Sequence, residues 1–538
     1  MKLINKLSVL ALASVALVGC ADLDTEPLGS TVTDDQKAGV VEDNPEMVKA
    51  SVVGITTQFS VYMKTYSNHN DFGYPSVMLF TDTRGMDLVA EDIGYNWFSG
   101  GLDFTDRPFN SSYTRMIWST LYNQIYAANA VAKTMNITPE TLAEKSDVSK
   151  FYGAQALAIR AFDYFNLAQL YQFTYVGNEE QPCVPLITDE NADEVASNGS
   201  KRTSVKDVYA QILSDLNLAD QCLKDNPVKR EDKRYVNRAA VLGLRARVEL
   251  VMNNWEAAKN DAQEALTECA KEGIAIAGIE DVNHPTFKDS NEKNWIWAIV
   301  IAESDRVVTS GIVNWPSHMG SLNYGYASVG AWRMINQKLY NSMNPSDVRK
   351  GWFLDGNCQS ANLSAEQQAY ITSAGCTPYT QVKFAPYKDE IYTSTNANDI
   401  PLMRIEELYL IKAEAEAMAG NPAQGVETLK AYMSYRDPSY AFEAKEGGYT
   451  ANGVQNEVWN QRRIELWGEG LSWFDIMRLK KGVDRRGAGF EPNLVFNLAA
   501  NDANLIFQIP KAEIEGNPAL TDADNNPAAT TPVPVPEN

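Results

Sequence analysis

The chain has 538 residues, of which 44% are hydrophobic and 10% aromatic, enough to build a large core or two or three packed units. Its 69 acidic residues outnumber its 47 basic residues, and the formal net charge is −22. Nucleic acids and anionic membrane surfaces bind clustered Lys and Arg. An acidic chain without a long basic run is therefore a poor candidate for either partner.

The N-terminus has the layout of an export signal. Two lysines precede an apolar segment at residues 7–18, which has the length of a signal-peptide core and is too short to span a bilayer. The sequence Leu-Val-Gly-Cys that ends at Cys20 resembles the lipobox of bacterial lipoproteins. The resemblance implies a signal peptide at 1–19, a stable anchor of several acyl chains on Cys20, and a lipidated tether at 20–36. The alternative is an ordinary secretory signal in which the cysteine is incidental.

Helical periodicity dominates the chain after residue 112. Apolar residues recur at alternating steps of three and four, the spacing of one helix face. The segments with this spacing are 118–135, 154–171, 205–223, 240–251 and 255–269. Residues 404–436 form a further helix pair of tetratricopeptide size, in which Gly420 ends one helix and Pro422 starts the next. The spacing predicts helical hairpins over about 112–271 and 404–481.

The region between these hairpins, at about 272–400, has a different composition. Gly, Ser, Asn and Pro become frequent, and Trp and Tyr cluster, which argues against disorder. A long irregular insertion in a helical scaffold is usually functional when it is ordered. Within it, residues 295–302 form an apolar run typical of a buried strand. The last residues, 522–538, are rich in Pro and Asn and are expected to be a flexible tail.

Several stretches of the chain resemble the RagB/SusD family of Bacteroidetes outer-membrane lipoproteins. They are YGAQALAIRAFDYFNLAQLYQ (152–172) followed by CVPLITDE (183–190), PLMRIEELYLIKAEAEAMAG (401–420), VWNQRRIELWGEGLSWFDIMRLKKG (458–482) and IFQIPKAEIEGNPAL (506–520). With the lipobox they occur in the family's order and span nearly the whole mature chain. The resemblance implies an all-α fold, in which tetratricopeptide-like hairpins form a superhelix that supports a loop-rich, irregular ligand-binding half. It also implies a single domain at 37–521.

The same resemblance implies a function. Family members are lipid-anchored in the outer membrane, face the cell exterior, and capture an oligosaccharide or polysaccharide. They deliver it to a SusC-like TonB-dependent transporter and act as its lid, and no catalysis is expected. We expect no cofactor, and the sequence singles out no metal ligands. Two alternatives remain open: capture of a peptide by the same arrangement, or a helical-repeat scaffold without a small ligand. The aromatic-rich insertion favours capture, because a scaffold needs no such loops.

The sequence lacks the motifs of common enzyme classes. The three histidines, His69, His284 and His318, have no close metal-ligand spacing, and neither a G-x-S-x-G elbow nor a P-loop occurs. Each histidine is expected in the core or on the surface. Paired carboxylates could hydrolyse a glycoside, but no pair stands out among 69 acidic residues. We therefore expect a binding protein with no catalytic residues.

Two loop-like stretches, 80–101 and 312–332, combine aromatic rings with planar polar side chains. The flat C–H face of a sugar can lie on Trp or Tyr, while its hydroxyls bond to Asn, Asp or Arg. The candidate ligand-binding residues are Asp82, Arg84, Tyr95, Asn96, Trp97, Trp315, Tyr324 and Tyr326. Any one of these rings could instead be a core residue. The Gly-flanked rings in irregular chain are less easily explained as core than those at helical spacing.

The charged helix at 458–482 is interpreted as structural. Arg462 with Glu465, and Asp475 with Arg478, stand three residues apart and can pair along one helix face. Gly468 and Gly470 weaken a helix, which is understandable if another backbone packs closely there.

The remaining cysteines suggest at most one disulfide. Cys358 and Cys376 flank a polar loop, and an exported protein can keep disulfides. Pairing of these two residues is one possibility, and free thiols are the other.

Overall fold

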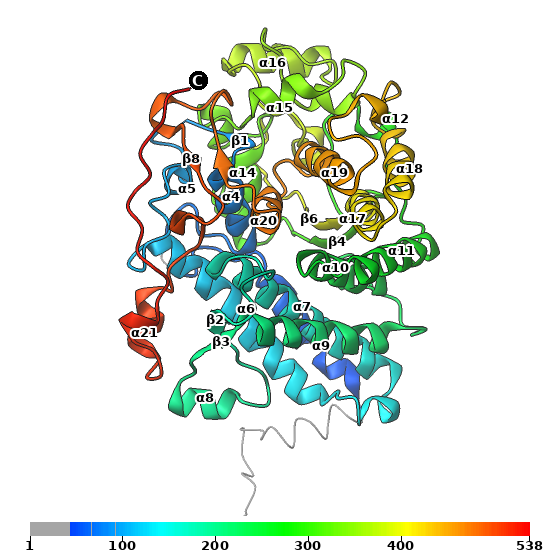
Figure 1. Cartoon of the computed structure of the whole chain (residues 1–538), viewed down its shortest axis with the longest axis vertical. Helices are drawn as coiled ribbons and strands as arrows, with labels where there is room; N and C mark the ends of the chain where they lie inside the picture. Colours follow the sequence, from blue (N-terminus) through cyan, green and yellow to red (C-terminus); the bar gives the residue numbers. More distant parts are fainter. Residues whose placement is uncertain (1–43, 66, 92, 538) are drawn as a thin grey trace, which may run out of the picture.

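Helices make up the body of the structure, and the strands form only short antiparallel pairs (Figure 1). The computed structural model describes residues 44–65, 67–91 and 93–537. The expected signal peptide, Cys20 and the tether lie outside the described residues. Within those ranges, none of the helices has both the length and the apolar character that crossing a bilayer requires. The all-α fold class expected from the sequence is confirmed.

A series of long helices forms the scaffold. In chain order they are α6 (Ser112–Met135), α7 (Asp147–Tyr171), α9 (Val205–Leu223), α10 (Arg238–Val251), α11 (Trp255–Lys271), α17 (Ile405–Met418) and α18 (Pro422–Met433). Each helix packs against the next one in this series. The series begins in the lower part of Figure 1 and continues up its right-hand side. The segments with helical spacing in the sequence coincide with these helices.

The turn between α17 and α18 shows how local chemistry sets this arrangement. Gly420 has a φ of 99°, a conformation that only glycine adopts without strain. Asn421 then caps α18, with its side chain accepting a hydrogen bond from the backbone N of Gln424 at 3.2 Å. A Cβ at Gly425 would lie 2.5 Å from the carbonyl O of Ala413. Glycine at this position therefore permits the close approach of the two helices.

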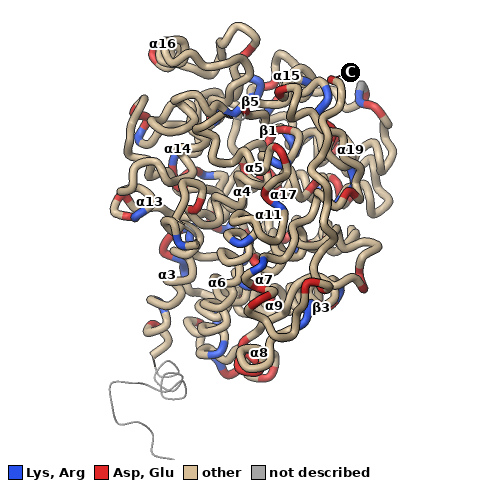
Figure 2. The backbone as a smooth tube through the Cα atoms, turned by 90° about the vertical axis from the view of Figure 1, so that its left-hand side faces the viewer, with Lys and Arg blue, Asp and Glu red and all other residues tan. Residues whose placement is uncertain are grey.

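The other half of the molecule carries short elements joined by long loops, and it occupies the upper left and the top of Figure 1. Its helices include α4 (Tyr74–Arg84), α5 (Ser99–Leu102), α13 (Arg306–Thr309), α14 (Trp315–Met319), α15 (Gln337–Ser342) and α16 (Ala365–Ala374). Further helices are α3 (Lys49–Thr57), α8 (Ala192–Asn198), α12 (Ile279–Val282), α19 (Ala451–Glu465), α20 (Ser472–Arg478) and α21 (Lys511–Gly516). Helices α8 and α16 lie at opposite ends of the long axis (Figures 1 and 2).

The described strands form four antiparallel pairs. They are β1 (Leu88–Val89) with β5 (Met334–Ile335), β2 (Pro182–Pro185) with β3 (Arg202–Ser204), β4 (Trp295–Ile299) with β6 (Ile400–Arg404), and β7 (Val483–Asp484) with β8 (Asn497–Leu498). Strand β4 is buried throughout, as its apolar sequence predicts.

The C-terminal segment does not form the flexible tail expected from its composition. After a short 3-10 helix at Asp522–Asp524, residues 525–537 run in extended form along the body, at the left edge of Figure 1. The Asn526 side chain is buried, and its amide donates to the carbonyl O atoms of Tyr171 and Phe507, both at 2.7 Å. Farther on, the backbone N of Val535 donates to Val495 O at 2.9 Å. The polar residues that suggested a loose end instead satisfy backbone groups of the body.

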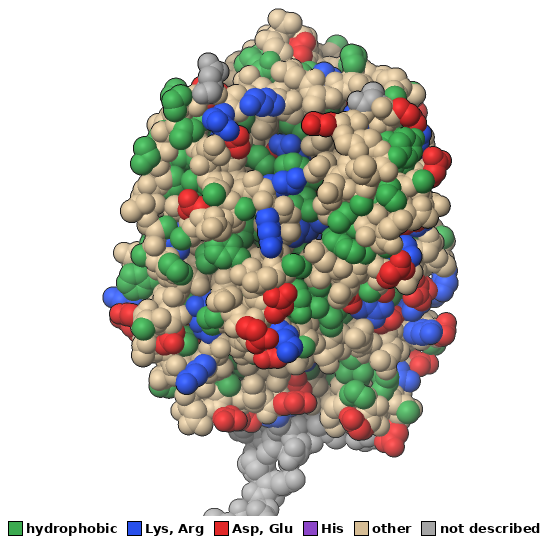
Figure 3. Space-filling view, in the orientation of Figure 1, with side chains coloured by type: hydrophobic (Ala, Val, Ile, Leu, Met, Phe, Trp, Pro, Cys, Tyr) green, Lys and Arg blue, Asp and Glu red, His purple; other side chains and the backbone are tan. Residues whose placement is uncertain are grey.

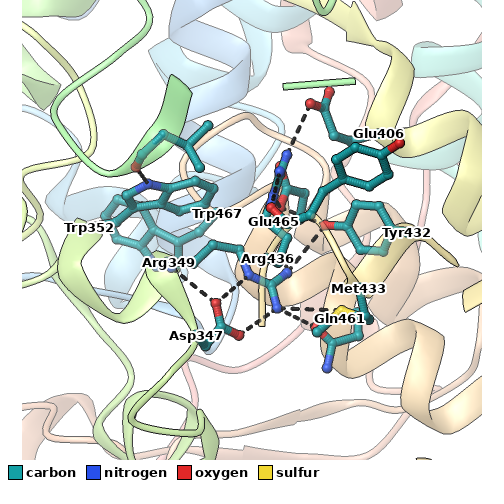
Figure 4. Close-up of polar contacts among 12 residues, drawn as sticks. Asp347, Arg349, Trp352, Glu406, Tyr432, Met433, Arg436, Gln461, Glu465 and Trp467 are labelled. Carbon is teal, nitrogen blue, oxygen red and sulfur yellow. Dashed lines mark hydrogen bonds and ion pairs between the residues drawn. The ribbon is translucent and has the colours of Figure 1, made fainter. Parts of the chain in front are cut away.

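A buried ionic network joins the helical series to the loop-rich half (Figure 4). The carboxylate of Glu465, at the end of α19, accepts hydrogen bonds from Arg404 at 3.0 Å and from Arg436 at 2.8 Å. The Tyr432 hydroxyl donates to the same carboxylate at 2.6 Å, and Arg349 approaches it to 3.5 Å. Burial alone would raise the pKa of Glu465, but the arginines outweigh burial and hold this pKa well below its usual range.

The neighbouring charges pair differently from the sequence-based expectation. Arg462 does not bind Glu465; it contacts Asp475 at 2.6 Å and Glu407 at 3.3 Å. The pair of Asp475 with Arg478 is confirmed at 2.7 Å. Glu465 is turned toward arginines from other elements, which outcompete a partner on its own helix.

Basic side chains gather on the surface where the helical series meets the loop-rich half. In Figure 3, Lys and Arg side chains line up down the middle of the view, over the junction between the helical series and the loop-rich half. Basic residues are therefore gathered locally, although the chain as a whole carries a net charge of −22.

Replacing Glu465 by Gln should destabilise the protein strongly. The change removes one of the two carboxylates that Arg404 and Arg436 share, the other being Glu406, and breaking a buried ion pair costs about 3–5 kcal/mol. Denaturant unfolding followed by circular dichroism measures the loss. The control is Glu427→Gln, because Glu427 is exposed on α18, and it should change stability by less than about 0.5 kcal/mol.

The Glu465→Gln deficit should also depend on pH. The folded-state pKa of Glu465 lies below its unfolded value, so its ionised form stabilises the protein above a pH of about 4.3. This contribution is lost as the pH falls toward the folded-state pKa. The stability gap between wild type and Glu465→Gln should therefore shrink below a pH of about 4.3. A gap that stays constant in acid would contradict the role assigned to the Glu465 carboxylate.

Candidate functional site

The structure brings the two aromatic stretches of the sequence together. Leu88 of β1 pairs with Ile335 of β5, so the chain after residue 88 lies beside the chain before residue 335. The Asn336 side chain adds a hydrogen bond to Met86 O at 2.8 Å. These contacts join segments almost 250 residues apart in the sequence.

Four rings then meet at one surface, which we call the aromatic platform: His69, Tyr95, Trp97 and Tyr326. The imidazole of His69 stacks on Trp97, with ring centroids 4.7 Å apart and planes inclined by 28°. Tyr326 lies 6.2 Å from Trp97 and 6.3 Å from Tyr95, and its hydroxyl hydrogen-bonds to Nδ1 of His69. Tyr95 is 55% exposed and Trp97 is partly exposed. Tyr326 itself is only 6% exposed, so the platform presents mainly Tyr95 and Trp97 to solvent.

The platform rests on a second layer of rings. The buried imidazole of His318, from α14, stacks between Tyr326 at 4.7 Å and Phe72 at 5.4 Å. Its Nε2 donates to the backbone O of His69 at 3.0 Å. Burial, together with the nearby charge of Arg333, holds the pKa of His318 well below its usual value. His318 is thus a neutral core residue that supports the platform from below.

Asn96 shapes the loop of the platform instead of facing solvent. Its buried amide donates to Glu91 O at 2.8 Å, and its Oδ1 accepts from the backbone N of Phe98 at 3.2 Å. These bonds fix the turn that carries Tyr95 and Trp97. Asn96 is therefore a turn residue here and has no free polar group to offer a ligand.

A separate tyrosine cluster, formed by Tyr324, Tyr370 and Tyr392, lies in the same loop-rich half. Tyr324 is 39% exposed and meets the edge of Tyr392, which is 51% exposed, at 5.2 Å. Tyr370 of α16 lies 5.9 Å from Tyr392. Backbone bonds from Tyr324 N to Thr393 O (2.9 Å) and from Tyr392 N to Leu322 O (2.7 Å) hold the two loops together.

Five of the eight predicted ligand-binding residues are buried: Asp82, Arg84, Asn96, Trp315 and Tyr326. Of these, Asp82, Arg84 and Trp315 take no part in the platform, which corrects the sequence-based expectation. Asp82 and Arg84 lie on α4, which is buried on every side. Asp82 accepts a hydrogen bond from Gly470 N at 2.9 Å, and burial raises its pKa to about 8. Arg84 pairs with Asp106 and lies over aromatic rings. Trp315 packs edge-on against a phenylalanine at 4.7 Å and is also buried. Side chains without exposed area offer no contact to a ligand.

Sequence reasoning missed His69, Tyr370 and Tyr392. His69 stands outside both aromatic stretches, and Tyr392 lies in the polar sequence YTSTNAND. The only local signal for Tyr392 is its place in a Ser- and Asn-rich loop, where an aromatic side chain has few neighbours in sequence to pack against. No local signal marks His69.

Cys358 and Cys376 are both thiols in the structure. The Cys358 Sγ donates to the carbonyl O of Cys376 at 3.2 Å. The two residues are neighbours, as their positions at the two ends of one loop suggested, and their oxidation to a disulfide stays a prediction.

No cluster of three or more His, Cys, Asp and Glu side chains in the described ranges is arranged to hold a metal ion. The groups that face solvent at the platform are rings and hydroxyls. This arrangement can bind a flat, hydroxylated ligand by stacking and hydrogen bonding.

Truncating Trp315 should lower the stability of the protein much more than truncating Tyr95, because Trp315 is buried and Tyr95 is exposed. Trp315→Ala leaves a cavity and should cost about 3–5 kcal/mol of stability. Tyr95→Ala, at an exposed position, should stay within about 0.5 kcal/mol of wild type. Thermal unfolding by calorimetry gives both values. Equal melting temperatures for Trp315→Ala and wild type would contradict its burial.

Two family models match the chain. The model described as "Starch-binding associating with outer membrane" matches residues 43–250, and the model described as "SusD family" matches residues 322–528. Among curated proteins, SusD-like protein P2 of Formosa agariphila is 24% identical over 536 residues, covering 95% of this chain and 97% of that protein.

Solved structures show the same fold. A SusD-like carbohydrate-binding protein of Bacteroides vulgatus superposes with a TM-score of 0.72 at 22% identity, covering 90% of this chain and 98% of its own. A laminarin-binding SusD-like protein superposes with a TM-score of 0.60 at 18% identity, covering 90% of this chain and 99% of its own.

Proposed function

Since this chain belongs to the RagB/SusD family, we propose that it captures an oligosaccharide or polysaccharide at the cell surface. In this proposal the protein is anchored to the outer membrane through acylated Cys20. It delivers the glycan to a SusC-like TonB-dependent transporter and lies over that transporter as a lid. It binds the glycan without cleaving it.

The observation that carries the proposal is the aromatic platform. Most aromatic side chains of the described chain are buried, yet Tyr95 and Trp97 expose ring surface beside Tyr326. A sugar ring gains apolar burial on such faces, and the tyrosine hydroxyls supply hydrogen bonds at the edges. The laminarin-binding protein with the same fold supports a glycan over a peptide as the ligand.

The tyrosine cluster extends the proposed binding surface. Tyr324 and Tyr392 are exposed and come from two loops that are bonded to each other. Tyr324 stands two residues from Tyr326 of the platform, which keeps the two groups of rings close together. Two neighbouring groups of rings suit a chain of sugars better than a single sugar.

Trp97→Ala should weaken glycan binding at least tenfold. Losing a large interface aromatic costs about 2 kcal/mol or more, which corresponds to roughly thirtyfold in affinity. Calorimetry against a panel of polysaccharides that includes laminarin and starch measures binding, and a reducing-end assay checks for cleavage. The matched control is Tyr126→Ala, because Tyr126 is 77% exposed on α6 and lies outside the platform.

Each other outcome of this experiment has a distinct meaning. If Trp97→Ala binds the glycan as tightly as wild type, the glycan site lies elsewhere than at the platform. Release of reducing ends would contradict binding without cleavage. If the protein binds peptides but no glycan, its ligand is a peptide. If it binds neither, the alternative function as a helical scaffold is favoured.

The transporter partnership predicts a stable complex. A tagged chain purified from outer membranes in mild detergent should bring down a large barrel protein. The Cys20→Ala control should lack the lipid anchor and should be recovered in the soluble fraction after the membranes are pelleted. Recovery of the wild-type chain alone, at native expression, would count against the role as a lid.

A further inference from the structure

We propose that His69 is a positioning residue of the aromatic platform, which holds Trp97 and Tyr326 at their mutual angle before a ligand arrives. The proposal rests on the proposed function, because it assigns a role within the glycan site. It concerns a residue that carries no aromatic signal in the sequence and belongs to neither of the stretches that suggested the site.

The contacts of His69 join Trp97, Tyr326 and the supporting His318. Its ring stacks on Trp97 at 4.7 Å, its Nδ1 hydrogen-bonds to the Tyr326 hydroxyl, and its backbone O accepts from Nε2 of His318 at 3.0 Å. Trp97 and Tyr326 themselves meet edge to face, at 6.2 Å and 69°. Tyr326 is buried and stacked on His318, and His69, which hydrogen-bonds to Tyr326 and stacks on Trp97, restricts the rotation of the Trp97 ring relative to it.

The segment around His69 is itself fixed. The His69 backbone N donates to Asn68 Oδ1 at 2.9 Å, and Asp71 N donates to Asn68 O at 3.0 Å. The Asn70 side chain donates to Trp97 O at 2.6 Å. The turn at 68–71 therefore holds the backbone of Trp97 through Asn70 and its ring through His69.

Preorganisation is the physical consequence. A ligand that must immobilise two free aromatic side chains loses affinity relative to one that meets them already in place. Removing the imidazole should free the Trp97 ring, while Tyr326 keeps its stack on His318, and we expect roughly a tenfold loss in affinity. The role is indirect, because His69 acts through Trp97 and Tyr326 and need not touch the sugar.

The first test measures laminarin and starch binding by calorimetry for His69→Ala and His69→Phe. His69→Ala should bind the active polysaccharide about tenfold more weakly than wild type. His69→Phe keeps a flat ring for stacking and loses the hydrogen bond to Tyr326, so it should recover part of the affinity. The control is His284→Ala, because His284 is exposed and hydrogen-bonds to its neighbour Asn283 at 3.2 Å, outside the platform, and this variant should bind like wild type.

Coupling to Tyr326 distinguishes positioning from simple destabilisation. In a double-mutant cycle with Tyr326→Phe, the losses from His69→Phe and Tyr326→Phe should not add, because both remove the same hydrogen bond. Additive losses would overturn the role of that bond. If His69→Ala melts at a lower temperature than wild type, His69→Phe decides the question, since it preserves the packing.

A ligand-free measurement keeps the inference separate from the proposed function. The indole N–H signal of Trp97, assigned with Trp97→Phe, should broaden or split in His69→Ala and stay sharp in His284→Ala. If neither polysaccharide binds but the signal changes in this way, the role of His69 stands and the proposed glycan ligand is wrong. An unchanged Trp97 signal, or wild-type affinity in His69→Ala, overturns the inference.

Discussion

The structure depends on one buried carboxylate. Glu465 accepts charged hydrogen bonds from Arg404, where β6 ends, and from Arg436, which follows α18. Arg349, from the insertion, approaches the same carboxylate. Burying one carboxylate is unfavourable unless cations and hydrogen bonds compensate it. The three elements must therefore come together at a single point, which ties the irregular insertion to the helical series.

The site follows from this constraint. Long loops have little regular hydrogen bonding of their own, so they hold a shape only where a rigid scaffold supplies contacts. Here the scaffold holds the insertion, and the short pair of β1 with β5 then places Tyr326 beside Trp97. Gly470, with a φ of 74°, packs against the backbone of Met78 on α4. A Cβ there would lie 2.8 Å from the Met78 Cα, so glycine is what lets α4 lie close enough to support the platform loop.

The same burial explains why the charged candidates, and Trp315 with them, lie outside the site while Tyr95 and Trp97 keep exposed surface. Arg84 and Asp82 belong to α4, whose whole surface is covered by other elements. A buried guanidinium needs an anion and π-faces, and Arg84 finds both in Asp106 and in the rings of Trp473 and Phe507. Tyr95 makes a ring contact with Tyr326 at 6.3 Å but is not enclosed by it. It is left in solvent, where an aromatic ring is available to a ligand.

The sequence by itself determined the helices, because their apolar spacing and the Gly420–Pro422 turn act over a few residues. It also predicted the loop-rich insertion and the stretches that hold Trp97 and Tyr326. It did not determine which polar residues would be buried, since Asp82 and Arg84 are buried by contacts with residues hundreds of positions away. It did not indicate His69 or Tyr392 either, because their partners, Tyr326 and Tyr324, lie far from them in the chain or in another loop. Only the tertiary structure decided these points, because exposure and pairing are properties of which segments pack together.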